Sequence, residues 1–186
     1  MNNPHFFGYG SLVNRQTHAY SSAHPARLPG WRRIWRHVAT RDVAFLTAYP
    51  SEGSTLEGLI AEVPGADWVA LDAREFSYLR ERTNHVTHDL DAAPDIHIYH
   101  APPDLHAPAT AQHQVLLSYL DAVVQGYLRE FGEAGVRNFF DTTDGWDAPI
   151  KDDRATPRYK RHQVLTSNET ALVNDELMRV GARLID

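Results

Sequence analysis

The 186-residue chain contains no cysteine, which excludes disulfide bonds, thiol nucleophiles and thiolate metal sites. It has no apolar run near the roughly 20 residues of a membrane span, and its first residues form neither a basic region nor an apolar leader. Basic residues are not in excess: the net charge is −6 with both signs mixed along the chain, whereas nucleic-acid-binding proteins usually have a basic face. We therefore expect a cytoplasmic protein that binds neither membrane nor nucleic acid.

The composition is that of an ordinary globular protein, with 42% hydrophobic and 23% charged residues. The length suits one domain with a core of its own. Strand patterns predict an antiparallel meander at residues 31–40, 43–49 and 55–63, with a turn at residues 50–54. Short extended segments are expected near residues 85–88 and 96–100. This part of the chain therefore predicts a β-sheet.

Helical periodicity is found mainly after these strands. Four segments are predicted to be helical: residues 67–82, 112–131, 136–140 and 168–179, the last capped by Asn168 or Thr170. Residues 142–161 are charged and loop-like. Because strands come first and helices late, the pattern predicts an α+β fold rather than alternating βαβ units.

A glycine-rich turn follows the first apolar strand, which begins at His5. Gly8 and Gly10 permit backbone angles that other residues resist, and without a Cβ they let successive N–H groups converge on an anion. A carboxylate or a phosphate would suit such a pocket. An isolated Gly-x-Gly is also common as a simple tight turn, so the motif alone leaves both interpretations open.

A carboxylate interrupts the apolar stripe of the predicted helix 67–82. Glu75 lies at helical spacing from Trp68, Leu71 and Leu79, which places it on the buried face. A buried glutamate must be paired, hydrogen-bonded or partly protonated, because desolvation raises its pKa. Either an arginine, Arg82 or Arg36, holds Glu75 in an ion pair, or catalysis uses it.

Together these features resemble the γ-glutamylcyclotransferase superfamily, whose members pair an N-terminal Tyr-Gly-Ser-Leu loop with a Leu-Asp-x-x-Glu helix. The matching stretches here are 9–12 and 71–75. Supporting similarities occur at residues 28–32, at 56–60, and at Tyr119-Leu120 with Gly126. The resemblance covers residues 5–130 and implies a mixed, barrel-like β-sheet with packed helices.

Some residues depart from the family pattern. Leu116 stands where relatives have a serine, and Phe76 follows Glu75 where many have a glycine. The segment from about residue 141 matches nothing in the family, so we expect a single domain over 1–186 with an atypical C-terminal extension. Trp146, Pro157 and Tyr159 are candidates to cover the pocket, although this segment could equally wrap the surface.

The resemblance implies an intramolecular reaction in which the α-amine of a γ-glutamyl group attacks its own γ-carbonyl and releases 5-oxoproline. No cofactor and no metal are implied, and the partner is a small γ-glutamyl compound. Glu75 is the expected general acid and base. The expected substrate-binding residues are Tyr9, Gly10, Ser11, Leu12 and Tyr119, with the backbone N–H groups of residues 10–12 on the α-carboxylate. Arg15 could assist binding of the α-carboxylate electrostatically.

Other interpretations stay open. The same fold could serve as a non-catalytic binding module that keeps the pocket. A metal site could use three histidine pairs, His85/His88, His97/His100 and His106/His113, but extended pairs point to opposite faces and no His-Glu-x-x-His helix is present. Ser11 lacks the surroundings of a nucleophile. Glutathione, a γ-glutamyl dipeptide and a γ-glutamyl amine are all possible substrates, and the oligomeric state is not specified.

Overall fold

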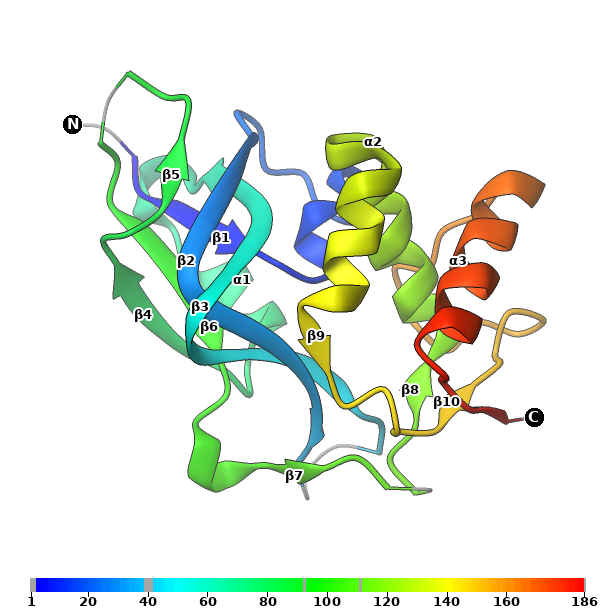
Figure 1. Cartoon of the computed structure of the whole chain (residues 1–186). Helices are drawn as coiled ribbons and strands as arrows, with labels where there is room; N and C mark the ends of the chain where they lie inside the picture. The colour runs from blue at the N-terminus through cyan, green and yellow to red at the C-terminus, as the bar shows by residue number, and fades with distance from the viewer. Residues whose placement is uncertain (1–2, 39–41, 92, 111, 186) are drawn as a thin grey trace.

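A long, bent β-hairpin organises the computed structural model, which describes residues 3–38, 42–91, 93–110 and 112–185. Its strands are β2 (His24–His37) and β3 (Phe45–Glu62), which pair antiparallel along almost their whole length. Figure 1 shows both strands curving strongly through the sheet. The predicted strand at 31–40 is the second half of β2, and residues 39–40 lie outside the described part of the chain.

The hairpin is the centre of a mixed sheet with the strand order β4-β6-β1-β3-β2-β5. The strands that join it are β1 (His5–Gly8), β4 (Leu79–Thr83), β5 (Thr87–His88), β6 (Ile96–His100), β7 (Ala107–Pro108) and β9 (Thr143–Asp144). β1 pairs antiparallel with β3 and parallel with β6. The predicted α+β fold with a mixed sheet is confirmed, but the sheet ends at β4 and β5 and does not close into a barrel.

The turn predicted at residues 50–54 is a bulge inside one strand. Pro29 pairs with Thr55 and Trp31 with Pro50, so residues 51–54 of β3 stand opposite Gly30 alone. Gly30 and Gly53 both have positive φ, +80° and +78°. Clusters of glycine, proline and serine interrupt a ladder at bulges as well as at turns. The two strands predicted on either side are therefore halves of β3, and the predicted meander is a hairpin.

Two long helices lie side by side next to the sheet (Figure 1). α2 (Leu117–Asp141) joins the predicted segments 112–131 and 136–140 across a non-helical Gly132, but it begins five residues later than predicted, since residues 115–116 form a strand. α3 (Ser167–Arg179) begins after Thr166, whose hydroxyl accepts from the backbone N–H of Glu169 in a capping box. The predicted caps Asn168 and Thr170 are therefore wrong. Within the described residues, no helix has the length and apolar character to cross a membrane.

The predicted helix 67–82 is much shorter than expected. α1 (Val69–Arg74) stops after six residues, and 79–83 form β4, paired antiparallel with β6. Pairing with an available strand outweighed the local helical periodicity. Leu79 of the predicted stripe is 54% exposed. The short 3₁₀ helices are Ser11–Val13, Arg15–Thr17, Pro64–Ala66 and Pro103–Leu105.

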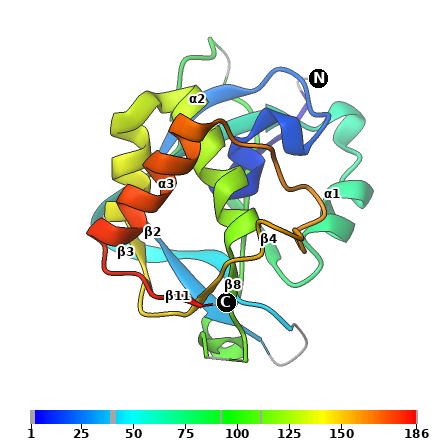
Figure 2. The same ribbon diagram turned by 90° about the vertical axis from the view of Figure 1, so that its right-hand side faces the viewer.

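A small parallel sheet attaches the C-terminal segment to the start of α2. It consists of β8 (Val115–Leu116), β10 (Ile150–Lys151) and β11 (Leu184–Ile185), with β10 in the middle. Between β10 and α3, residues 152–166 cross toward α1 and turn back (Figure 2). We call residues 152–166 the crossing segment. It brings part of the C-terminal segment close to the start of α2.

One arginine is fully buried between the sheet and α2. Arg33 donates to the hydroxyls of Thr142 (2.8 Å), Thr143 (3.1 Å) and Tyr127 (3.2 Å). Burial lowers the pKa of the Arg33 guanidinium and raises that of the Tyr127 phenol to about 12. The Tyr127 hydroxyl in turn donates to the backbone oxygen of Tyr9 (2.9 Å). This chain of hydrogen bonds connects the core to the glycine-rich turn.

Candidate functional site

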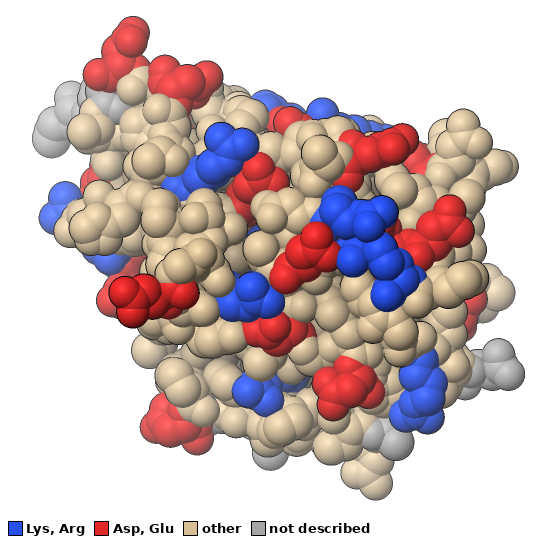
Figure 3. Space-filling view, in the orientation of Figure 1, with Lys and Arg blue, Asp and Glu red and all other residues tan. Residues whose placement is uncertain are grey.

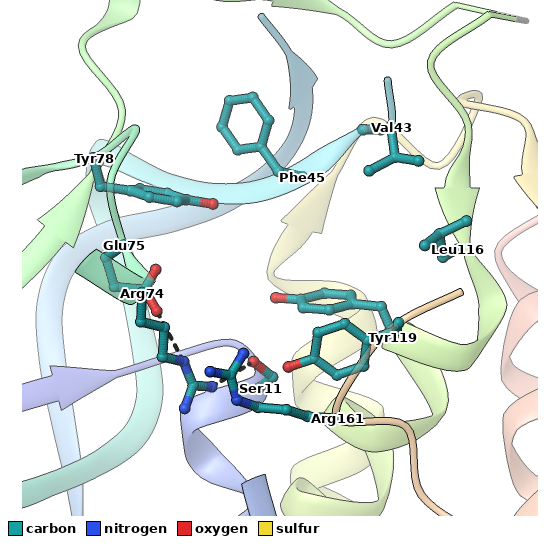
Figure 4. A pocket seen from close by; sticks show the side chains of 11 residues that line it. Ser11, Val43, Phe45, Arg74, Glu75, Tyr78, Leu116, Tyr119 and Arg161 are labelled. Carbon is teal, nitrogen blue, oxygen red and sulfur yellow. Dashed lines mark hydrogen bonds and ion pairs between the residues drawn. The ribbon is translucent and has the colours of Figure 1, made fainter. Parts of the chain in front are cut away.

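Two adjoining cavities lie where β1, α1 and the start of α2 meet. The outer cavity has a volume of about 180 Å³ and the inner one about 40 Å³. Four residues line both cavities: Ser11, Glu75, Tyr78 and Tyr119. The inner cavity is completed by residues 7–10, Leu12, Leu46 and Tyr99; the outer one by residues 43–45, Arg74, Leu116, Tyr159 and Arg161 (Figure 4). All six predicted site residues therefore line the inner cavity.

The glycine-rich turn is held from two sides. The Tyr9 hydroxyl donates to the backbone oxygen of Tyr99 on β6 (2.6 Å), and the Tyr9 backbone oxygen accepts from Tyr127 on α2. The backbone N–H of Val13 donates to the Gly10 oxygen (3.0 Å) and starts the 3₁₀ turn. The Tyr9 side chain is thus buried and hydrogen-bonded to β6, while Tyr9 also borders the inner cavity.

Close packing gives a physical reason for the two glycines of the turn. Neither Gly8 nor Gly10 has a positive φ; that of Gly10 is −115°. A Cβ on Gly10 would lie 2.6 Å from the Tyr119 hydroxyl oxygen, and one on Gly8 would lie 2.5 Å from the Cβ of Leu12. The absence of a Cβ therefore allows side chains to approach the turn closely.

Glu75 projects into the pocket from the turn after α1, not from the middle of a helix. Its backbone N–H donates to the Leu71 oxygen (2.9 Å) and closes the last turn of α1. Its side chain is 18% exposed and lies 3.2 Å from the Arg74 Nε. Figure 4 shows the carboxylate facing the Tyr119 hydroxyl across the cavity. Of the two arginines expected beside it, Arg82 instead pairs with Asp95 at 2.6 Å.

Arg74 is a site residue that the sequence did not single out. Its guanidinium donates to the Ser11 hydroxyl (3.1 Å) and to the backbone oxygen of Thr17 (3.0 Å), in addition to its contact with Glu75. It therefore links α1 to the glycine-rich turn and fixes the Glu75 side chain next to it. Its position beside Glu75 inside the Leu-Asp-x-x-Glu motif was the available signal.

Buried tyrosine hydroxyls surround the inner cavity. Burial raises the pKa of Tyr119 well above its usual range, and the nearby Tyr159 and Glu75 raise it further. Burial similarly raises the pKa of Tyr9 and Tyr99. These phenols are neutral at physiological pH and act as hydrogen-bond donors there. Tyr78 donates to the Leu46 backbone oxygen (2.7 Å), so it supports the pocket wall.

The structure does not bring Arg15 into the pocket. Arg15 forms a two-pronged ion pair with Glu130 of α2, at 2.6 and 2.9 Å. Of the three residues proposed to cover the pocket, only Tyr159 reaches it, with its ring edge-on to Tyr119 at 5.1 Å. Trp146 stacks on Phe140 (4.7 Å) in the core, and Pro157 is exposed beside another cavity.

A buried carboxylate fixes the crossing segment at the start of α2. Asp153 accepts from the backbone N–H of Ser118 (2.8 Å), its hydroxyl (2.6 Å) and the backbone N–H of Arg158 (2.9 Å). The next residue, Arg154, pairs with Asp121 at 2.7 and 2.8 Å. These contacts place Tyr159 and Arg161 at the outer cavity.

Replacing Asp153 should therefore loosen this segment. Burial by itself would raise the pKa of the Asp153 carboxyl, but hydrogen bonds from Ser118 and Arg158 outweigh it and lower that pKa. We expect Asp153→Asn to reduce the free energy of unfolding by about 1–3 kcal/mol at pH 7. Because the pKa of Asp153 is lower in the folded than in the unfolded state, where it is about 3.9, the ionised carboxylate stabilises the folded protein at pH values above about 3.9. The difference in unfolding free energy between wild type and variant should therefore shrink as the pH falls below about 4.

Urea unfolding of wild type and variant at pH 7 and pH 3 measures this difference. Asp175→Asn, which changes an exposed carboxylate on α3, is the matched control and should match wild type at both pH values. An equal loss at both pH values for Asp153→Asn would show that packing, and not the ionised carboxylate, stabilises the segment.

The histidines do not form a metal site in the described parts of the chain. Within them, no three histidine or acidic side chains come close enough to hold an ion. His97 contacts Asp95 (3.1 Å), His100 contacts Glu81 (2.8 Å), and His113 stacks on His37 (3.9 Å). On the face shown in Figure 3, basic and acidic side chains are interspersed.

Comparison with known proteins identifies relatives of this chain. The sequence model of the family described as "Gamma-glutamyl cyclotransferase, AIG2-like" matches residues 6–119, more than half of the chain. That range contains Glu75 and the glycine-rich turn but ends before the crossing segment. A search of curated proteins gave no significant match.

Solved structures share the fold at low sequence identity. A structure titled gamma-glutamyl cyclotransferase has a TM-score of 0.56 at 13% identity, covering 93% of this chain and 99% of that one. An uncharacterised Homo sapiens protein gives 0.55 at 13% identity, covering 94% and 99%. YkqA from Bacillus subtilis gives 0.56 at 17% identity over 78% of this chain, and the match spans only 57% of that protein.

Proposed function

The chain belongs to the gamma-glutamyl cyclotransferase, AIG2-like family, and on that premise we propose that it releases 5-oxoproline from small γ-glutamyl compounds. The observation that carries this proposal is the Glu75 carboxylate in the wall shared by the two cavities, opposite the Tyr119 hydroxyl. A cyclisation of this kind needs one group that first removes a proton and then returns it, and a substrate held in a folded conformation.

The γ-glutamyl group is proposed to bind with its α-carboxylate end in the inner cavity and its γ-carbonyl at the boundary with the outer cavity. Its α-carboxylate lies against the backbone of Gly10, Ser11 and Leu12, and its α-amine lies next to Glu75. Such positioning of amine and carbonyl can equal an effective molarity of about 10⁵ to 10⁸ M. Arg74, which contacts both Ser11 and Glu75, holds the two sides of this arrangement together.

In the reaction, Glu75 takes a proton from the α-amine as its nitrogen forms a bond to the carbon of the γ-carbonyl. The bond between this carbonyl carbon and the departing nitrogen then breaks, and Glu75 returns the proton to the departing amine. The products are 5-oxoproline and a free amine, with no change in redox state. Tyr119 is proposed to hydrogen-bond the substrate during these steps.

Measured release of 5-oxoproline from glutathione, γ-Glu-Ala and γ-glutamyl-lysine tests the proposal. We expect release from at least one of these compounds without any added cofactor. Binding of these compounds by the folded protein without turnover would instead support a non-catalytic module. A cytoplasmic location, with no nucleic-acid or membrane partner, stays a prediction from the sequence.

A further inference from the structure

An arginine from the crossing segment reaches the mouth of the pocket. Arg161 lines the outer cavity together with Arg74 and Glu75, and Figure 4 shows its side chain extending toward Ser11. It does not line the inner cavity. In the part of the chain that the structure describes, no carboxylate forms an ion pair with its guanidinium. Arg161 therefore offers charge and donors to whatever enters the outer cavity.

The charges around the outer cavity do not balance. Its charged lining residues are Arg74, Glu75 and Arg161, and Arg74 lies 3.2 Å from Glu75. One positive charge remains, on Arg161. Arg74 and Arg161 also line a neighbouring groove together, so the two guanidinium groups border the same opening. The rest of the wall includes apolar Val43, Phe45 and Leu116. This environment favours an anion at one side of the mouth.

The backbone that carries Arg161 is well anchored. The Asp153 carboxylate accepts from the backbone N–H of Arg158, and the Ser118 hydroxyl lies 3.3 Å from the backbone nitrogen of Tyr159. The His162 backbone N–H donates to the Tyr159 oxygen (3.0 Å), which closes a turn around Arg161. Because this turn is fixed to α2, less ordering is needed when Arg161 binds a ligand.

We propose that Arg161 selects substrates whose departing amine bears a carboxylate close to its nitrogen, that is, γ-glutamyl α-amino acids rather than γ-glutamyl amines. This rests on the proposed function. With the α-carboxylate end of the γ-glutamyl group in the inner cavity, the departing part lies in the outer cavity, which Arg161 lines. In a γ-glutamyl α-amino acid the carboxylate is one carbon from the departing nitrogen, so it stays near the mouth. A guanidinium binds a carboxylate through paired hydrogen bonds.

Two substrates that differ only at this carboxylate test the proposal: γ-Glu-Ala and its C-terminal amide, γ-Glu-alaninamide. We expect the wild-type kcat/KM to be about 10-fold higher for the acid, mainly through KM, as for one hydrogen-bonded charge pair. Arg161→Gln should lower kcat/KM for the acid about 10-fold and leave the amide within about 2-fold. Arg161→Lys should keep part of the preference, and added salt should weaken it.

Arg158→Gln is the matched control, because Arg158 is an exposed arginine of the same segment outside the cavity lining. It should retain the wild-type preference for the acid. If Arg161→Gln lowers kcat/KM equally for both substrates, Arg161 contacts the γ-glutamyl group or supports the cavity wall. This inference is then overturned while the proposed function stands. If folded wild type releases 5-oxoproline from neither acid, amide nor glutathione, the proposed function is overturned and this inference with it.

Discussion

Glu75→Gln is expected to reduce 5-oxoproline release by at least about 100-fold, because a positioned acid–base group contributes on the order of 10² to 10⁴-fold. The amide keeps the size and most hydrogen bonds of the carboxylate, but it cannot accept the proton of the α-amine. In the proposed reaction Glu75 handles that proton twice, so its loss affects both bond formation and bond cleavage. The measurement is single-turnover 5-oxoproline release at substrate saturation.

The same variant should remain folded. The side chains of Arg74 and Glu75 are 10% and 18% exposed, and the amide oxygen of the variant can still accept a hydrogen bond from Arg74, so we expect a loss of only about 0.5–1.5 kcal/mol. We therefore expect the unfolding midpoint to stay within a few degrees of wild type. Glu133→Gln, which changes an exposed glutamate of α2, serves as the control and should keep both activity and stability.

The opposite result would support the structural interpretation of Glu75. If Glu75→Gln lost several kcal/mol of unfolding free energy while the remaining folded molecules kept full activity, the carboxylate would be an ion-pair partner of Arg74 and not the general base. Calorimetric measurement of ligand binding by the variant distinguishes loss of catalysis from loss of the pocket.

Gly10→Ala is the second variant with a large expected effect. Its Cβ would lie 2.6 Å from the Tyr119 hydroxyl oxygen, so either the turn or the phenol must move. We expect a loss of about 1–3 kcal/mol in unfolding free energy, as for other overpacked sites. We also expect activity to fall about 100-fold, since a displacement of about 1 Å at a reacting centre can have that effect.

A second substitution should relieve the clash. Without the phenolic oxygen, the nearest atoms to that Cβ are the Leu46 Cδ2 at 3.6 Å and the Tyr119 ring carbon at 3.9 Å, which are ordinary contacts. Gly10→Ala combined with Tyr119→Phe should therefore be about as stable as Tyr119→Phe alone. Thermal unfolding of the four proteins in a double-mutant cycle measures this coupling.

Gly8→Ala provides the comparison. Its obstacle is the Cβ of Leu12 at 2.5 Å, which Tyr119→Phe does not remove. In that background the loss of stability should persist. If Tyr119→Phe left the Gly10→Ala defect unchanged, the turn would accommodate the methyl group by another route, and the packing explanation for Gly10 would be wrong.

The sequence predicted the parts of the site that depend on short motifs. The Tyr-Gly-Ser-Leu turn and Glu75 are far apart in the sequence, yet they line the same cavities. The first strand and β6 were also recognised from local patterns. These features could be predicted because close packing at the turn and burial of a single carboxylate restrict which residues occur there.

Features that depend on tertiary pairing could not be predicted. Residues 79–83 have helical periodicity but form β4, because β6 presents a strand edge that the local sequence does not reveal. Glycine and proline at residues 50–54 mark a bulge whose partner, Gly30, is visible only once the hairpin register is known. No motif in the sequence distinguishes Arg161 from other arginines. The hydrogen bonds between Asp153 and Ser118 bring its segment to the pocket.

Two parts of the chain build the pocket, one inside the range that the family model matches and one beyond it. Glu75 and the glycine-rich turn lie within residues 6–119, which the family shares, whereas Tyr159 and Arg161 come from beyond that range. Asp153 and Arg154 are the polar attachments of this outer part to α2. In the proposed reaction, substitutions in the crossing segment are therefore expected to change which compounds are accepted without altering the atoms that carry out the chemistry. We expect the same of an exchange of the whole segment, provided that its two attachment residues are retained.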